Sequence, residues 1–145
     1  MTEQGIDVLI ARGSSAVRGD GAAFRFLTDF PNINIPLVLI FFREPDRAPV
    51  LFVESRFQAM RAAKYSWVED IRLSSNFFQS LTEVLGETGF AHASLGIDGL
   101  HNFPFLWGQK LEEIFPGVKL VEFGPTLKRL RAYRTPEEIK LVKKS

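Results

Sequence analysis

Cysteine is absent from this chain of 145 residues. Its absence excludes disulfide bonds, thiolate nucleophiles and thiolate metal ligands. Histidine is scarce, because only His92 and His101 occur, and they are not spaced as a metal-binding pair on one helix. We therefore expect each histidine to be solvated or to cap a nearby backbone group rather than to bind a metal ion.

Long apolar runs and a strong net charge are missing as well. No apolar stretch approaches the roughly 20 residues of a membrane span. The opening segment MTEQGIDVLIARG has no basic region before its short apolar run, so we expect no signal peptide. The formal net charge of +1 argues against general attraction to nucleic acid or anionic membranes. We expect a soluble, cytoplasmic protein that has neither nucleic acid nor a membrane as partner.

Two apolar runs, Leu37–Phe42 and Val50–Glu54, are the clearest strands in the sequence. Neither alternates apolar with polar residues, as is typical of strands covered on both faces. The turn sequence REPDRAP separates them, which predicts an antiparallel hairpin. Further strands are expected over residues 6–11, 67–72, 94–98 and 118–123.

Helical periodicity and capping residues occur between these strands. Ser55 and Asn76 are expected to cap helices, whereas the pattern of Phe24–Phe30 fits a helix or a strand. Phe57 and Met60 are expected at helical spacing. The residues that we expect on an apolar stripe or inward face of a helix are Phe77, Phe78, Leu81, Val84 and Leu85; Trp107, Leu111, Ile114 and Phe115; and Leu127, Leu130 and Tyr133. Strands that alternate with helices predict an α/β protein, a three-layer α/β/α domain with a mixed sheet.

A strong helix start occurs near the end of the sequence. Thr135 can cap a helix, Pro136 suits its first turn, and Glu138 completes a capping box. Only about ten residues follow, fewer than the roughly 12–15 that make an isolated helix even marginally stable. We therefore expect one domain over residues 1–134, with residues 135–145 beginning a further domain of a longer protein.

Reactive constellations are sparse in the rest of the sequence. There is no GxSxG elbow and no GxGxxG phosphate loop. Four acids near expected strand ends raise the alternative of a two-metal nuclease, namely Asp7, Glu54, Asp70 and Asp98. Acids also gather at strand ends because these ends face water, and we favour that explanation.

Several segments in a fixed order carry a family resemblance: GIDVLIA, FRFLTDF, LVLIFF with VLFVE, SWVEDIR, GIDG and LRAYRTPEEIKLVKKS. The sequence resembles the N-terminal domain of creatinase, aminopeptidase P and the Xaa-Pro dipeptidases (prolidases). The terminal motif is the most specific part, and Asp29 stands where the family usually has glycine. The resemblance implies the creatinase N-terminal fold, which contains a ribonuclease H-like motif.

The resemblance also implies a function. Such a domain is noncatalytic, contributes to a homodimer, covers the active site and limits substrate length. Its partners are its own C-terminal catalytic domain and a proline-containing peptide substrate. That "pita-bread" domain would carry two divalent metal ions (manganese, cobalt or zinc) on five ligands that lie beyond Ser145. The chain itself is therefore expected to hold no cofactor and to be inactive alone.

Residues after FLTDF occupy the position that, in creatinase-like proteins, approaches the active site of the neighbouring subunit. By that resemblance the candidate contacts to the substrate end are Asp29, Phe30, Asn32 and Asn34. The alternative, which we favour, is that Phe30 packs in the core and both asparagines form turn hydrogen bonds. Two other functions stay open: a creatinase-like amidinohydrolase, or a peptidase-like binding or chaperone protein without catalysis.

Overall fold

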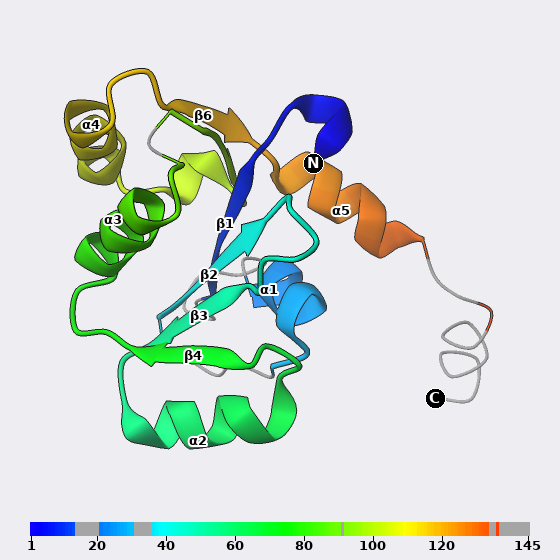
Figure 1. Ribbon diagram of the computed structural model, residues 1–145. Helices are drawn as coiled ribbons and strands as arrows, with labels where there is room; N and C mark the ends of the chain where they lie inside the picture. Colours follow the sequence, from blue (N-terminus) through cyan, green and yellow to red (C-terminus); the bar gives the residue numbers. More distant parts are fainter. Residues whose placement is uncertain (14–20, 31–35, 91, 134–135, 137–145) are drawn as a thin grey trace.

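The computed structural model describes residues 1–13, 21–30, 36–90, 92–133 and 136 (Figure 1). A six-stranded sheet forms the centre. Its strands are β1 (Val8–Gly13), β2 (Leu37–Phe42), β3 (Val50–Val53), β4 (Asp70–Leu73), β5 (Ser94–Ile97) and β6 (Lys119–Glu122). The helices are α1 (Gly21–Thr28), α2 (Arg56–Tyr65), α3 (Phe77–Glu87), α4 (Phe105–Ile114) and α5 (Gly124–Ala132), with 3-10 turns η1 (Thr2–Gln4) and η2 (Leu100–Asn102).

The strand order is β4-β3-β2-β1-β5-β6, and the sheet is mixed. Strand β2 runs antiparallel to both of its neighbours, whereas β3 and β4, β1 and β5, and β5 and β6 pair in parallel. The predicted hairpin is therefore confirmed, with Val38 opposite Phe52 and Ile40 opposite Val50. Among the described strands, only β2 opposes the common direction.

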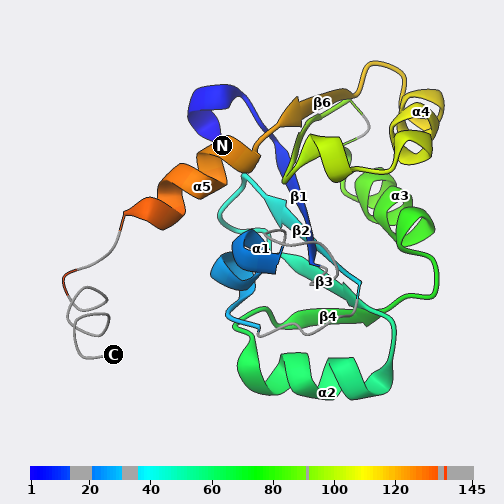
Figure 2. The same cartoon turned by 180° about the vertical axis from the view of Figure 1, so that it is seen from behind.

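Helices cover both faces of the sheet, so the predicted three-layer architecture is confirmed (Figures 1 and 2). Helices α3 and α4 close one face, where Leu85 and Leu111 join Val8 and Ile10 in a single large core. Helices α1, α2 and α5 lie on the other face over two smaller clusters. Successive residues of β1 enter cores on opposite faces, as the two-residue period of a strand requires.

Helix α3 forms as predicted. The side chain of Asn76 accepts a hydrogen bond from Gln79 N at 3.2 Å, which caps the first turn. Leu81, Val84 and Leu85 are buried, and Gly89 follows the helix with a φ of 76°. A positive φ is readily adopted only by glycine, so Gly89 allows the chain to turn away after the helix.

Helix α4 differs from the prediction at one position. Leu111 and Phe115 are buried, and Trp107 packs partly against the same core. Ile114, expected to face inward, is 50% exposed. Leu111 and Phe115 are four residues apart and share a face, whereas Ile114 precedes Phe115 by one residue and is turned about 100° away from it.

The ambiguous segment Phe24–Phe30 begins within a helix, α1, which ends at Thr28. The Thr28 hydroxyl donates to Phe24 O at 2.8 Å and accepts from Phe30 N at 3.1 Å. Asp29 then adopts a φ of 55°. This left-handed conformation is one that aspartate tolerates better than most residues, and it ends the helix.

Helix α2 begins with the predicted cap at Ser55. The Ser55 hydroxyl accepts from Gln58 N, and Gln58 Oε1 accepts from Ser55 N at 2.9 Å, which completes a capping box. Phe57 and Met60 lie at helical spacing in α2, as expected, and are 65% and 73% exposed. Gln58 and Ala62 face the sheet instead. The small Ala62 lets the helix lie close to the sheet, and Gln58 is held there by its capping bonds.

Helix α5 buries only Leu127, the first of the three residues that were expected on its inward face. Leu127 is 1% exposed, but Leu130 and Tyr133 are 49% and 78% exposed, so their predicted inward position was wrong. Each step of three residues turns about 60° short of a full circle, so the stripe rotates off the sheet. Figure 1 shows the end of α5 extending beyond the strands. Of the expected terminal helix, only Pro136 lies among the described residues.

Candidate functional site

A cavity of about 750 Å³ lies at the carboxyl ends of β5 and β6. The first turns of α1 and α5 border it, together with Asp98, Gly99, His101, Glu122, Lys128 and Arg131. Helix α1, which comes after β1 in the sequence, lies on one face of the sheet. Helix α4, which comes after the neighbouring strand β5, lies on the other face. In open α/β sheets, such a divergence between adjacent strands is a common position for a ligand.

Glu122 is the central acid of this cavity, and its carboxylate is engaged by the backbone. It accepts hydrogen bonds from Leu100 N at 2.7 Å, Gly124 N at 2.8 Å and Gly99 N at 3.3 Å. A Cβ at Gly124 would lie 2.8 Å from Glu122 Oε1, so glycine permits this approach. The carboxylate neutralises the N-terminus of α5 and ties it to η2. The sequence analysis did not predict this role of Glu122. The feature that could have indicated it is the Glu-Phe-Gly sequence between a strand and a helix.

Both histidine rings make hydrogen bonds within the domain. His92 Nδ1 lies 2.9 Å from Pro116 O, and His101 Nε2 lies 3.0 Å from the amide nitrogen of Asn102. The carbonyl of Asn102 accepts from Arg12 Nη1, and the Arg12 guanidinium lies 5.3 Å from the Trp107 ring centroid. Within the described part of the chain, no three His, Asp or Glu side chains are grouped so as to hold a metal ion.

The acids considered for a nuclease do not converge. Asp7 lies before β1, where it accepts from Ser94 N at 2.9 Å and pairs with Arg43 at 2.9 Å. Asp70 begins β4 and pairs with Arg72, and this hydrogen bond raises the pKa of Arg72. Asp98 follows β5 and Glu54 follows β3. Because β1, β3, β4 and β5 run in one direction, these two acids lie at the carboxyl ends of the strands, opposite the ends where Asp7 and Asp70 lie. This arrangement does not favour a two-metal nuclease.

The predicted substrate contacts fall into three classes. Asp29 is exposed at the end of α1, whereas Phe30 is 2% exposed within the core on that face. The Arg61 guanidinium lies 5.7 Å from the Phe30 ring centroid. Asn32 and Asn34 lie outside the described residues. The burial of Phe30 agrees with the packing alternative, and a substrate contact at Asp29 stays a prediction.

Comparison with known proteins assigns the family. The model of the creatinase/prolidase N-terminal domain matches residues 1–133. The chain belongs to this family. No curated protein sequence gave a match. Among the described helices, none is both long enough and apolar enough to cross a membrane.

Solved structures share the fold of this creatinase/prolidase N-terminal domain at low sequence identity. Aminopeptidase P of Streptococcus thermophilus is 20% identical, with a TM-score of 0.64 over 90% of this chain and 88% of that chain. The N-terminal domain of cytoplasmic peptidase PepQ of Mycobacterium tuberculosis is 20% identical, with a TM-score of 0.65 over 90% and 91%. The Xaa-Pro dipeptidase of Bacillus anthracis is 16% identical, with a TM-score of 0.71 over 99% of this chain but 36% of that chain.

Proposed function

We propose that the chain is the noncatalytic N-terminal domain of a di-metal Xaa-Pro peptidase. The observation that carries the proposal is the difference in coverage between two relatives. The chain accounts for 91% of the PepQ N-terminal domain but for 36% of the B. anthracis dipeptidase. A catalytic domain would therefore follow, and we place the boundary between residues 1–134 and residues 135–145.

The catalytic work would belong to that following domain. It would hold two divalent metal ions (manganese, cobalt or zinc), whose bridging water attacks the peptide bond before proline. The family match and the names of the relatives support this assignment. The Glu122 cavity offers no alternative centre, because backbone N–H groups already engage its carboxylate.

The domain itself would act by position. It would contribute to a homodimer, cover the active site and limit the length of the proline-containing peptide. Covering the cleft excludes water and strengthens electrostatic interactions inside it. We place the protein in the cytoplasm, in line with the description of the PepQ relative.

The experiment compares the complete natural gene product with the 145-residue chain. Both are loaded with manganese and assayed on Xaa-Pro dipeptides and on matched dipeptides without proline. We expect the complete product to cleave only the Xaa-Pro bond and the 145-residue chain to cleave neither substrate. Hydrolysis by the 145-residue chain, or a complete product without this activity, would overturn the proposal.

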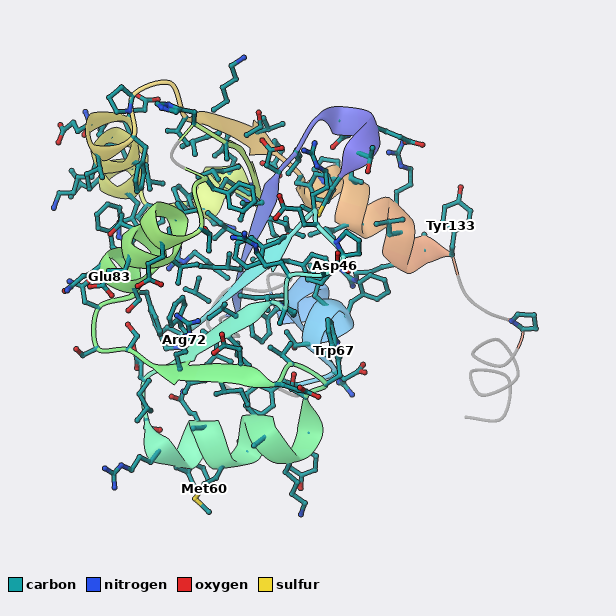
Figure 3. The ribbon with its side chains drawn as sticks, viewed as in Figure 1. Asp46, Met60, Trp67, Arg72, Glu83 and Tyr133 are labelled. Atoms are coloured by element: carbon teal, nitrogen blue, oxygen red, sulfur yellow. The ribbon has the colours of Figure 1, made fainter. Side chains whose placement is uncertain are left out.

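Asp29 offers a test of the covering role within the complete protein. Asp29→Asn keeps a residue that tolerates the observed φ of 55° and removes the charge. We expect it to change the ratio of kcat/KM for dipeptides to that for longer peptides. The matched control is Asp46→Asn, at an exposed acid in the β2–β3 turn (Figure 3). Equal ratios in both variants would exclude Asp29 as a substrate contact.

A further inference from the structure

The cavity beside Glu122 is lined by two cations that have no ion-pair partner. Lys128 and Arg131 lie on α5 and border the cavity. Neither belongs to an ion pair in the part of the chain that the structure describes. Because they are three residues apart, they share one side of the helix, where like charges repel each other. An anion in the cavity would relieve this repulsion and pair with both side chains.

The backbone at the start of α5 is not available to such an anion. The carboxylate of Glu122 already accepts hydrogen bonds from Gly124 N, Leu100 N and Gly99 N. The side chains of Lys128 and Arg131 would therefore hold the ligand, rather than the N-terminus of the helix. Lysine and arginine are the two side chains that most often bind phosphate groups, through charge-assisted hydrogen bonds to the phosphate oxygens.

The size and the opposite wall of the cavity restrict the ligand. Its volume of about 750 Å³ is within the range of small-molecule sites. Ala22, Ala23 and Pro125 add apolar surface, whereas Asp98 and Glu122 place two carboxylates where β5 and β6 end. These carboxylates repel a second anionic group, so the rest of the ligand should be neutral. Two cations match the charge of a single phosphate monoester, which is about −1.5 to −2 at neutral pH.

We propose that this cavity binds a small organic phosphate monoester, whose phosphate group is held by Lys128 and Arg131. The cavity lies where α1 and α4 diverge to opposite faces beside the adjacent strands β1 and β5, a position at which α/β sheets commonly bind phosphate-bearing ligands. The site belongs to this domain alone and concerns binding only, so it does not depend on the proposed function.

NMR titration of the 15N-labelled 145-residue chain tests the proposal with three matched probes: fructose, fructose 6-phosphate and fructose 1,6-bisphosphate. We expect fructose 6-phosphate to shift the amide signals of residues 98–101 and 122–131 saturably. Fructose lacks the phosphate group and should shift none of them. The bisphosphate should bind more weakly than the monoester, because its second phosphate meets Asp98 and Glu122. Inorganic phosphate should also bind more weakly, because it leaves most of the cavity unfilled.

Charge variants test the two cations. Arg131→Gln and Lys128→Gln should each weaken the binding of fructose 6-phosphate at least about tenfold, because each removes a charge-assisted hydrogen bond. The matched control is Arg129→Gln, which changes the net charge equally. Arg129 is turned about 100° from Lys128 and borders a separate hollow beside η1. We expect the control to change the affinity by less than about threefold.

A variant without a charge change tests the cavity itself. Ala22 is partly exposed in the first turn of α1, so Ala22→Phe can place a larger side chain in the cavity without displacing the core. We expect it to weaken binding as strongly as Arg131→Gln. Thermal unfolding without ligand shows whether each variant folds. If Ala22→Phe does not fold, the comparison of Arg131→Gln with Arg129→Gln decides.

Three results would overturn the proposal. Equal losses in Arg129→Gln and Arg131→Gln, or tighter binding of the bisphosphate than of the monoester, would indicate general attraction to the cations of α5. Inorganic phosphate that binds as tightly as fructose 6-phosphate would exclude a site for an organic ligand. The absence of saturable shifts with up to about 10 mM fructose 6-phosphate would exclude the site altogether.

Discussion

The two faces of the sheet are closed to different degrees. On the α3/α4 face, one continuous core joins both helices to β1, β2, β3 and β5. On the α1/α2/α5 face, the buried residues divide into two clusters, and partly buried side chains border the smaller one. The α3/α4 face therefore buries its apolar side chains within the domain, whereas the other face leaves several of them partly exposed to water.

The strongest test of this comparison removes a side chain from the closed face. Leu85 is fully buried in α3, so Leu85→Ala should lower the free energy of unfolding by about 3 kcal/mol. Urea denaturation of the 145-residue chain measures the change. A loss below about 1 kcal/mol would show that the α3/α4 face is less tightly packed than its burial indicates.

A second test asks whether the other face is also tightly packed beneath its open surface. A Cβ at Gly13 would lie 2.8 Å from Cγ of Phe24, which is fully buried. We expect Gly13→Ala to cost about 1–3 kcal/mol, measured by the same denaturation. The control is Gly86→Ala in α3, where nothing lies within 4 Å, and it should stabilise the helix by up to about 1 kcal/mol. Equal effects would contradict close packing at Gly13.

The third test concerns the start of α2 on the same face. Ser55→Ala removes one half of the capping box and should cost about 1 kcal/mol. Thermal unfolding of the variant is compared with that of Ser75→Ala, at an exposed serine outside any helix. If the two variants unfold alike, the cap contributes nothing to the stability of this face.

The smallest effect is expected at the open surface itself. Leu130 is 49% exposed, so Leu130→Ala should change the stability of the 145-residue chain by no more than about 0.5 kcal/mol. Urea denaturation beside Leu85→Ala gives the direct comparison between the two faces. A loss above about 1 kcal/mol would mean that Leu130 supports the fold of the domain by itself.

Most of the fold could be predicted because its strands and helix caps are local signals. The runs Leu37–Phe42 and Val50–Glu54 required a buried hairpin, and Asn76 marked the start of α3 correctly. Inward faces were less predictable. Periodicity identifies residues that share a side of a helix, but it does not say which of them reach the sheet, as Ile114 shows, or where the sheet ends beneath α5, as Tyr133 shows.

The candidate site was less accessible to sequence reasoning. Glu122 bonds to backbone groups more than twenty residues earlier in the chain, so its role depends on the parallel pairing of β5 and β6. In contrast, the apolar character of Phe30 was enough to favour its packing in the core, and the side chain is buried there. Local patterns predict burial better than they predict contacts between distant segments.

The parallel pairing of β1 with β5 affects how this domain can emerge from the ribosome. Val8 lies opposite Leu95, so the middle of the sheet joins segments about 90 residues apart. At a synthesis rate of roughly 5–20 residues per second, the first strand waits about 5–20 s for its neighbour. During that interval the edge of β1 that will pair with β5 has no native strand beside it, and its unpaired N–H and C=O groups are open to mispairing.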